Sequence, residues 1–241
     1  MITMEWSTKF HGYLNRIKRV ISQCDLCGNN VQTNLLICDA CFADLPLFNQ
    51  NITQTDLLNW PAINRALPDV YFDHLFCLSP YLSPFTQWLP QFKYKGRFEL
   101  STLFVDLLYQ QWQKVGSQYA NVDLVLSVPL YISKWQARGY NQAHLIAEKL
   151  AKKIAVPYQA SILQRIKHNE SQVGQTGKQR RRNLADTFML VEPLSQNVNH
   201  VVLVDDVVTT GSTASEISKI LKKAGVAKVT LVTVCLTLPK V

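Results

Sequence analysis

The sequence predicts an α/β protein, in which a parallel sheet is flanked by helices and preceded by a small metal-binding module. An apolar strand, a loop and an amphipathic helix follow one another over residues 122–155, and again over residues 201–223. This alternation is typical of a parallel sheet with helices on both faces. Two Cys-x-x-Cys motifs near the N-terminus predict the module. We therefore divide the chain into an N-terminal part, residues 1–60, and a larger domain, residues 61–241.

Composition limits the classes of protein to which the chain can belong. Its 241 residues are 47% hydrophobic and 17% charged, which predicts a packed core rather than bulk disorder. No apolar run is long enough for a membrane span, and charged residues interrupt the N-terminus too often for a secretory signal. We therefore expect a cytoplasmic protein without integral membrane association. The net charge of +8 favours an anionic partner, such as nucleic acid, a nucleotide or a membrane surface.

The N-terminal part begins with an amphipathic helix predicted over Thr8–Ile21, which suits packing against the protein or, less commonly, a membrane surface. A polar connector, with some helix near residues 55–67, ends it. Between them lie two pairs of cysteines separated by ten residues: Cys24, Cys27, Cys38 and Cys41. Four thiolates at this spacing suit one structural Zn²⁺ with no open position for catalysis. Redox disulfides and buried thiols are the alternatives, and a reducing compartment favours zinc.

The larger domain starts with a strand predicted at Asp73–Tyr81, a helix that opens at Pro84 and a second helix over Phe98–Lys114. The run Lys93-Tyr94-Lys95-Gly96-Arg97 lies between the two helices. Three cations in five residues suit either a solvated basic turn or a loop that contacts an anion, and the local sequence leaves both open.

The first strand–loop–helix repeat has its strand at Val122–Val128 and its helix at Asn141–Ala155. The intervening loop carries Pro129, Leu130 and Arg138. Ligands bind parallel sheets at the carboxyl ends of the strands. We therefore expect this loop and the corresponding loop of the second repeat to open on the same edge and to form the two halves of one site.

The second repeat supplies the most specific candidate site. Its strand, Val201–Val204, is followed by two acids, a loop of small hydroxyl residues and a helix that begins near Ala214. Backbone N–H groups at a helix N-terminus hold phosphate, and glycine lets the backbone approach it. The acids suit ribose hydroxyls or Mg²⁺. An ordinary strand–turn–helix connection is the alternative. The candidate phosphate-binding residues are Asp205, Asp206, Thr209, Thr210, Gly211, Ser212 and Thr213.

The most basic stretch, residues 165–182, lacks apolar periodicity and is predicted to be a long loop. Its cations suit closure over a diphosphate or contact with a nucleic-acid backbone, and a purely solvated loop is the alternative. Further strands are predicted at Thr187–Val191 and Val229–Leu236. The candidate nucleic-acid contacts of the whole chain are Lys93, Lys95, Arg97, Arg138, Lys178, Arg180, Arg181 and Arg182.

Together these motifs resemble the ComF family over nearly the whole chain. The loop at residues 205–213 is similar to the phosphoribosyl-pyrophosphate (PRPP) loop of type I phosphoribosyltransferases. The resemblance implies a phosphoribosyltransferase domain preceded by a zinc finger, a role in handling single-stranded DNA during natural transformation, and a helicase-like partner called ComFA. Besides the paired cysteines and the loop, it rests on Tyr94-Lys95-Gly96-Arg97, Val128-Pro129-Leu130, Arg138-Gly139-Tyr140-Asn141-Gln142-Ala143, Gln172-Val173-Gly174-Gln175 and Arg180-Arg181-Arg182-Asn183-Leu184.

By that resemblance, Asp205 and Asp206 contact ribose hydroxyls, residues 209–213 bind a 5′-phosphate, and Pro129 and Leu130 take the place of the pyrophosphate loop. Transferases often have a basic turn at that place, whereas this chain has its nearest cations further on. We therefore expect a competence protein that retains a PRPP or nucleotide site, with structural Zn²⁺ and with Mg²⁺ accompanying PRPP. The first alternative is an active phosphoribosyltransferase, with Asp205 and Asp206 as candidate catalytic residues. The second is a nucleotide sensor without transfer.

Overall fold

The computed structural model describes residues 23–31, 36–49, 56–115, 119, 121–166 and 187–237. The chain divides into two compact units, Met1–Pro46 and Leu47–Val241. This division comes earlier than the predicted boundary after residue 60, because Phe48 and Leu57 are buried in the core of the second unit. The predicted helix at Thr8–Ile21 lies outside the described residues. Within the described ranges, no helix is long and apolar enough to cross a membrane.

The first unit is organised by two tight turns that carry the cysteines. An isolated antiparallel bridge joins Gln23 to Asn30, and the turn between them is closed by a hydrogen bond of 2.9 Å from the Gly28 N–H to the Cys24 carbonyl. Gly28 has a φ of +75°, which favours glycine. The second pair of cysteines lies at the start of helix α2 (Asp39–Ala43), where Cys38 is the N-cap residue.

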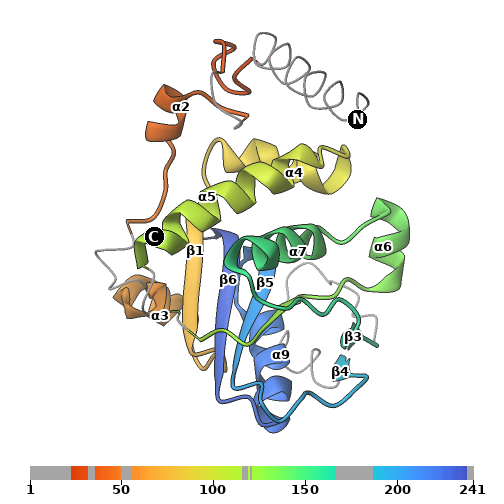
Figure 1. Ribbon diagram of the computed structural model, residues 1–241. Coiled ribbons are helices and arrows are strands. Elements are labelled where there is room, and N and C mark those ends of the chain that lie inside the picture. Colours follow the sequence, from red (N-terminus) through yellow and green to blue (C-terminus); the bar gives the residue numbers. More distant parts are fainter. Residues whose placement is uncertain are drawn as a thin grey trace, which may run out of the picture. The chain divides into compact units, whose positions relative to one another are not determined.

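The second unit contains a four-stranded parallel sheet in the order β1-β6-β5-β2 (Figure 1). Its strands are nearly all buried, as expected for a parallel sheet covered on both faces. Ser127, the last residue of β2, is aligned with Val204, so β5 continues past the end of β2. The strands are β1 (His74–Pro80), β2 (Leu124–Ser127), β5 (His200–Val208) and β6 (Lys228–Leu236).

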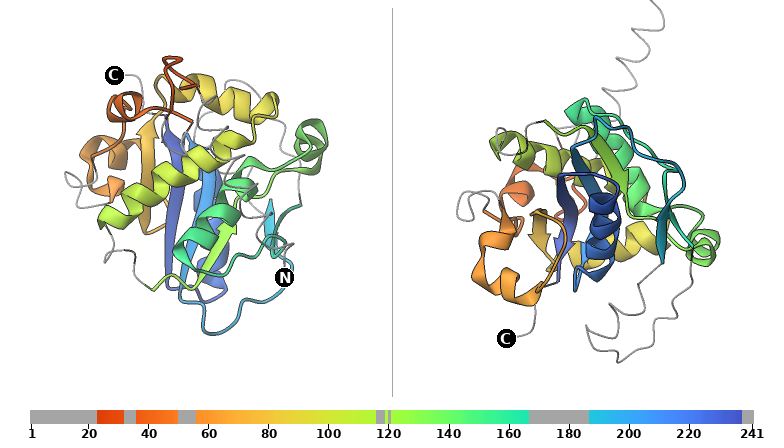
Figure 2. Two further views of the ribbon diagram at one scale, coloured as in Figure 1. Left: turned by 45° about the horizontal axis from the view of Figure 1, so that its top comes forward. Right: turned by 90° about the horizontal axis from the view of Figure 1, so that it is seen from below.

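Helices cover both faces of this sheet (Figure 2). One face is covered through an aromatic cluster that includes Phe76, Trp88 and Phe104. The helices on that face are α4 (Phe85–Tyr94), α5 (Glu99–Val115) and α7 (Gln142–Ile154). The opposite face packs against aliphatic residues of α9 (Ser212–Lys223), η1 (Leu57–Asn59) and α3 (Pro61–Ala66). The strands and helices predicted for the two repeats are therefore present.

Two elements differ from the sequence prediction. The expected loop between β2 and α7 contains a short helix, α6 (Ile132–Arg138), which ends at Gly139 with a φ of +78°. No residue of α6 is buried, so it lacks the apolar periodicity that reveals a helix packed on a core. The predicted strand at Thr187–Val191 is β4 (Phe188–Leu190), which pairs antiparallel with β3 (Leu163–Arg165) in a separate two-stranded sheet.

Candidate functional site

The two acids of the second repeat lie near the carboxyl end of β5. Because β2 has already ended, Asp205 and Asp206 border an edge where one neighbouring strand is missing. On the other side, the Thr233 hydroxyl of β6 donates a hydrogen bond of 3.0 Å to the Asp206 carbonyl. The acids were expected after the strand, but pairing with β6 extends β5 to Val208. Successive side chains of a strand point to opposite faces of the sheet, so the Asp205 and Asp206 carboxylates have different surroundings.

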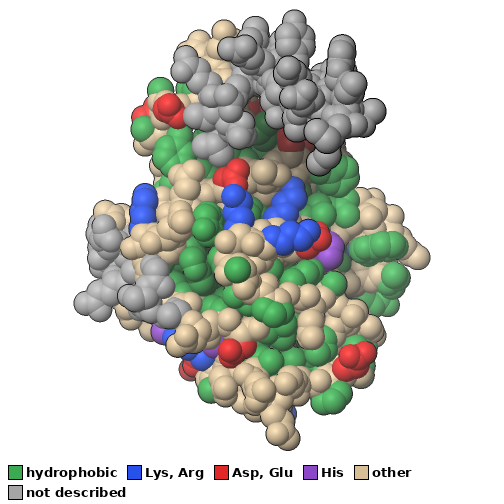
Figure 3. All heavy atoms as spheres, in the orientation of Figure 1, with side chains coloured by type: hydrophobic (Ala, Val, Ile, Leu, Met, Phe, Trp, Pro, Cys, Tyr) green, Lys and Arg blue, Asp and Glu red, His purple; other side chains and the backbone are tan. Residues whose placement is uncertain are grey.

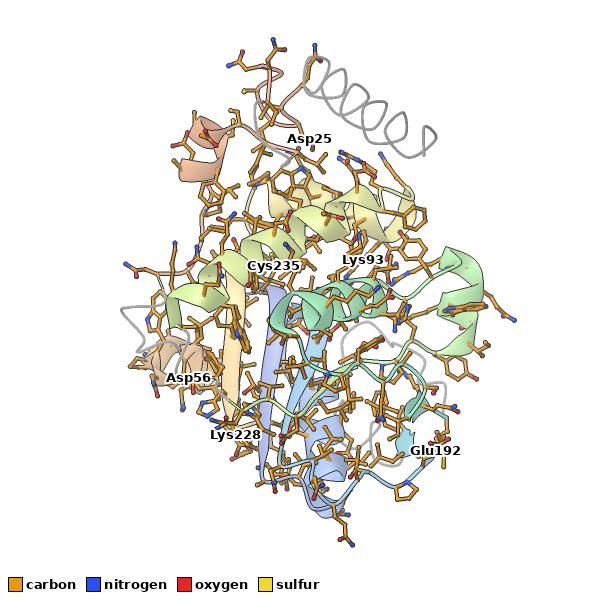
Figure 4. The ribbon with its side chains drawn as sticks, in the orientation of Figure 1. Asp25, Asp56, Lys93, Glu192, Lys228 and Cys235 are labelled. Carbon is orange, nitrogen blue, oxygen red and sulfur yellow. The ribbon has the colours of Figure 1, made fainter. Side chains whose placement is uncertain are left out.

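Lys93 reaches Asp206 from the last turn of α4. Its Nζ lies 2.9 Å from Asp206 Oδ1, and the two side chains are only 21% and 12% exposed. In Figure 4, Lys93 lies toward the same end of the sheet as Cys235, whereas Lys228 marks the opposite end of β6. Lys93 is thus part of the carboxyl-end site, although the sequence indicated it only as a nucleic-acid contact. No local pattern signals this contact, because the two residues are far apart in the sequence.

Asp205 has an unusual environment for a carboxyl group. Burial raises the pKa of Asp205 to about 7, and the neighbouring charge of Asp206 contributes to the rise. The Asp206 N–H, which donates a hydrogen bond of 2.8 Å to Asp205 Oδ1, and the positive charge of Lys93 act in the opposite direction. Near neutral pH, Asp205 can therefore gain or lose a proton, while Asp206 is paired with a cation.

The hydroxyl-rich loop leads directly into α9 and surrounds a small hollow of about 50 Å³. Gly211 is the N-cap residue, and no described side chain caps the helix. The Thr210 and Ser212 hydroxyl oxygens lie 2.9 Å apart. Free N–H groups at the start of a helix, together with hydroxyl donors around a small hollow, are typical of a phosphate site.

The segment before β1 packs against this loop and against α9. A Cβ on Gly211 would lie 3.3 Å from Leu67 Cδ2 and 3.5 Å from Phe72 Cε1, and the φ of Gly211 is +67°. The Tyr71 N–H donates a hydrogen bond of 3.1 Å to the Ser215 hydroxyl of α9. Both the backbone angle and the close contact therefore favour glycine at position 211. Sequence reasoning missed this support, because it depends on packing between distant segments.

The loop after β2 forms the other side of the carboxyl end, as predicted. Val128 donates a backbone hydrogen bond of 2.9 Å to Val204, and the Asn141 side-chain amide donates one of 3.0 Å to the Val128 carbonyl. Pro129 and Leu130 line a hollow of about 480 Å³ beside this loop. The two loops therefore follow neighbouring parallel strands and open on the same edge.

Several cations lie close to one another near this edge, although Pro129 and Leu130 themselves carry no charge. The pKa of the Lys134 ammonium on α6 is lowered by partial burial and by the positive charges of Arg165, Arg138 and Lys93. The Arg165 guanidinium lies 5.5 Å from the centre of the Phe188 ring, and its buried Nε has no hydrogen-bond partner among the described residues. Cations held together in this way favour an anionic ligand.

The remaining predicted nucleic-acid contacts fall in two groups. Lys95 is exposed at the end of α4, and Arg97 donates hydrogen bonds of 2.7 Å to Glu99 and 2.9 Å to Gln91. Arg138 lies over the Tyr94 ring, 4.9 Å from its centre, and donates to the Tyr94 hydroxyl. The second group lies outside the described residues: Lys178, Arg180, Arg181 and Arg182.

The four cysteines of the first unit could hold one metal ion. Their Sγ atoms all lie within 4.8 Å of one another, and those of Cys27 and Cys38 are 3.6 Å apart. Tetrahedral Zn²⁺ with bonds of about 2.3 Å brings its sulfur ligands roughly 3.8 Å apart, so the donor set fits zinc. Burial raises the pKa of Cys24, but backbone N–H groups of Cys27, Cys38 and Leu26 outweigh it and lower the pKa to about 6. Cys77 and Cys235 belong to the core of the second unit, as predicted.

The two acids and the hydroxyl-rich loop of the carboxyl-end site lie within a segment that matches a known family model. Residues 141–239 match the phosphoribosyl transferase domain. Competence protein F of Haemophilus influenzae is 36% identical over 163 residues, which cover 66% of this chain and 70% of that protein. The chain belongs to the ComF family. The DNA utilization protein YhgH of Salmonella typhimurium is 30% identical to this ComF-family chain over 219 residues, which cover 89% of this chain and 90% of that protein.

The ComF-family chain has the type I phosphoribosyltransferase fold preceded by a cysteine module, as the sequence predicted. A hypoxanthine phosphoribosyltransferase from Staphylococcus aureus is similar over 56% of this chain and 62% of its own, with 16% identity and a TM-score of 0.34.

Proposed function

We propose that this chain is a competence accessory protein that handles single-stranded DNA and retains a site for PRPP or a nucleotide phosphate. One observation carries the proposal: Asp205 at the carboxyl end of β5 and the hydroxyl-rich start of α9 border a single small hollow, and Asp206 is the next residue of the strand. In a phosphoribosyltransferase fold, this arrangement matches the chemistry of a ribose phosphate. The hollow takes the phosphate, and the acids lie beside it for the ribose.

The ligand chemistry follows from the groups present. The N–H groups at the start of α9 and the hydroxyls of Thr209, Thr210, Ser212 and Thr213 bind a 5′-phosphate. Carboxylate oxygens are suitable partners for ribose hydroxyls, and they also suit Mg²⁺, which would neutralise part of a diphosphate. The cations on α6 and β3, with Pro129 and Leu130 beside them, supply the positive charge that a diphosphate requires.

The DNA-handling part of the proposal is supported by the relatives and by charge. Two relatives carry the names competence protein F and DNA utilization protein. The chain has a net charge of +8. Lys95 and Arg97 lie between α4 and α5, and Arg138 is the last residue of α6. Phosphate contacts by Lys and Arg release counterions and make binding strongly dependent on salt. The proposed partners are single-stranded DNA, PRPP or a nucleotide, and a ComFA-type helicase, in the cytoplasm.

A second group of cations is a weaker candidate for DNA. Lys and Arg side chains form a row across one face of the second unit, over α5 and α7 (Figure 3). However, the α7 lysines are engaged within the protein: Lys149 donates to Ser101 and Thr102, Lys152 pairs with Glu148, and Lys153 pairs with Asp106. Their charge is therefore partly compensated. We place the DNA contacts on the α4–α6 side.

An active phosphoribosyltransferase that uses PRPP and Mg²⁺ is the second candidate. The raised pKa of Asp205 favours it, because a carboxyl group that titrates near neutral pH can exchange a proton with a substrate. Transfer would also require stabilisation of the developing positive charge on the ribose and of the departing diphosphate. Release of pyrophosphate in the presence of an acceptor base distinguishes transfer from binding alone.

Calorimetric titration with PRPP and Mg²⁺, run with and without a single-stranded oligonucleotide, tests the proposal. We expect the wild type to bind PRPP, Ser212→Ala to bind it more weakly, and Ser195→Ala, outside the loop, to match the wild type. Oligonucleotide binding should weaken roughly three-hundredfold between 50 and 200 mM salt if about six phosphates are contacted. Absence of PRPP binding would refute the proposed phosphate site. DNA binding that does not depend on salt would refute the proposed DNA-handling role.

A further inference from the structure

A hollow of about 480 Å³ lies beside the loop after β2, and we call it the α6–α7 hollow. Its volume is within the range of pockets that hold small organic ligands. It is lined by residues of three kinds: apolar side chains of the loop, two large aromatic rings, and a polar end formed by Ser127 and His144. The phosphate-binding loop is not among its lining residues, so it is a separate feature of the same edge.

The two aromatic residues of the hollow are held differently. Tyr140 is fixed, because its hydroxyl donates to the Phe92 carbonyl and its ring lies 4.6 Å from that of Phe98. Trp135 is 49% exposed on α6, and its indole makes no ring contact with any described residue. A half-exposed indole that lines a hollow is suited to stacking against another planar ring.

The polar end of the hollow offers a hydrogen-bonding group. His144 Nδ1 lies 2.6 Å from the Tyr158 hydroxyl, which in turn lies 3.0 Å from the Ser127 hydroxyl. When Tyr158 donates to Nδ1, the neutral ring carries its hydrogen on Nε2, and this nitrogen has no partner in the described ranges. The Asn141 side chain is already engaged at both ends, with Ala143 and Val128. His144 is therefore the group that can donate a hydrogen bond to the polar edge of a bound planar ring.

The surface next to the hollow combines exposed aromatic residues with cations. Tyr94 is 68% exposed and Phe98 is 51% exposed, and Phe98 is joined to the hollow through Tyr140. Arg138 lies over the Tyr94 ring, and Lys95 and Arg97 come from the same α4–α5 connection. Exposed rings interleaved with positive charges are typical of surfaces that bind single-stranded nucleic acid, where bases stack and phosphates meet cations.

We propose that the α6–α7 hollow takes one nucleobase of a single-stranded DNA, stacked on Trp135 and hydrogen-bonded by His144, while Tyr94 and Phe98 stack its neighbours. This inference rests on the proposed handling of single-stranded DNA and adds how the bases, rather than the phosphates, are held. An apolar protein segment would gain little from the three cations beside the rings. The phosphates of a strand that crosses Tyr94 and Phe98 would meet Lys95, Arg97 and Arg138.

Base removal tests the proposal directly. Fluorescence anisotropy would compare a labelled single-stranded oligonucleotide with one of the same length whose central nucleotides are abasic. Because each stacked base contributes to affinity, we expect the wild type to bind the abasic strand at least roughly tenfold more weakly. Trp135→Ala should lose part of this preference, with an unchanged salt slope, because Tyr94 and Phe98 still stack the neighbouring bases, and Trp135→Phe should recover part of the loss. Trp60→Ala is the matched control, because Trp60 is 42% exposed at the η1–α3 junction and packs against Phe48.

The outcomes separate this inference from the proposed function. If the wild type binds base-containing and abasic strands equally, the base pocket is refuted while DNA handling stands. The same holds if Trp135→Ala and Trp60→Ala behave alike. If no DNA binds at any salt concentration, the proposed function fails. The hollow is then tested with the nucleoside of 2-aminopurine: fluorescence quenching that disappears in Trp135→Ala supports a base pocket, and absence of quenching refutes it.

Discussion

Lys93 Nζ lies 2.9 Å from Asp206 Oδ1, and this ion pair joins the last turn of α4 to the carboxyl end of β5. Both side chains are largely out of water, so each depends on the other for charge compensation. The pair also brings a positive charge to a site whose ligand is expected to be a phosphate. Any ligand that approaches Asp206 therefore meets an acid that is already paired.

Removal of Lys93 should destabilise the protein more than removal of Asp206. Lys93→Met leaves the Asp206 carboxylate buried without its cation, and we expect a loss of roughly 3 kcal/mol. Asp206→Asn should cost less, because the long Lys93 side chain can reach solvent. The double variant should recover most of the Lys93→Met loss. Urea unfolding measures each free energy, and Lys95→Met, at an exposed neighbouring lysine, is the control. Additive losses in the double variant would contradict the coupling.

The stability of the protein should fall as the pH rises through the range in which Asp205 ionises. The folded-state pKa is about 7 and the unfolded value is 3.8, so the native state holds the proton more tightly between these values. This contribution to stability is complete below the unfolded pKa and is lost as pH rises through the folded pKa. Asp205→Asn should flatten the decline between pH 5 and pH 8, as measured by thermal unfolding. Asp69→Asn, at an exposed acid, should keep the wild-type slope.

The sequence was sufficient for the elements whose pattern is local. The strand at Val201 and the helix at Ala214 are correctly predicted, because a continuous apolar run and a helical apolar stripe are read directly from neighbouring residues. The hydroxyl loop between them also has its signal in consecutive residues. Its position at the edge shared with the β2 loop follows from general rules for parallel sheets.

Features that depend on packing between distant segments could not be predicted. Lys93 contacts Asp206 only because α4 crosses the end of the sheet, and nothing near Lys93 in the sequence indicates that contact. The support of Gly211 by Leu67 and Phe72 has the same cause. Helix α6 escaped prediction because none of its residues is buried, so no apolar stripe marks it.

Gly211→Ala should weaken phosphate binding as well as stability. The new Cβ would lie 3.3 Å from Leu67 Cδ2, and the backbone has a φ of +67°, so both contact and backbone angle oppose the change. Gly225→Ala is the matched control: its φ is +97°, but nothing lies within 4 Å of the added Cβ. We expect both variants to lose about 1–2 kcal/mol from the backbone, with a further loss only for Gly211→Ala. Calorimetry should show weaker PRPP binding for Gly211→Ala and wild-type binding for Gly225→Ala.

Zinc removal should unfold the first unit and leave the second unit folded. Four thiolates whose sulfur atoms lie within 4.8 Å fit one tetrahedral ion, and small modules of this kind derive most of their folding free energy from the metal. Elemental analysis of the wild type should give about one zinc per chain, and Cys27→Ser should lose it. Cys77→Ala, which alters a buried thiol in the core of the second unit, should retain it. After chelation, limited proteolysis should cleave before Pro46 while thermal unfolding of residues 47–241 persists. Equal zinc content in Cys27→Ser and the wild type would show that the cysteines do not bind the metal.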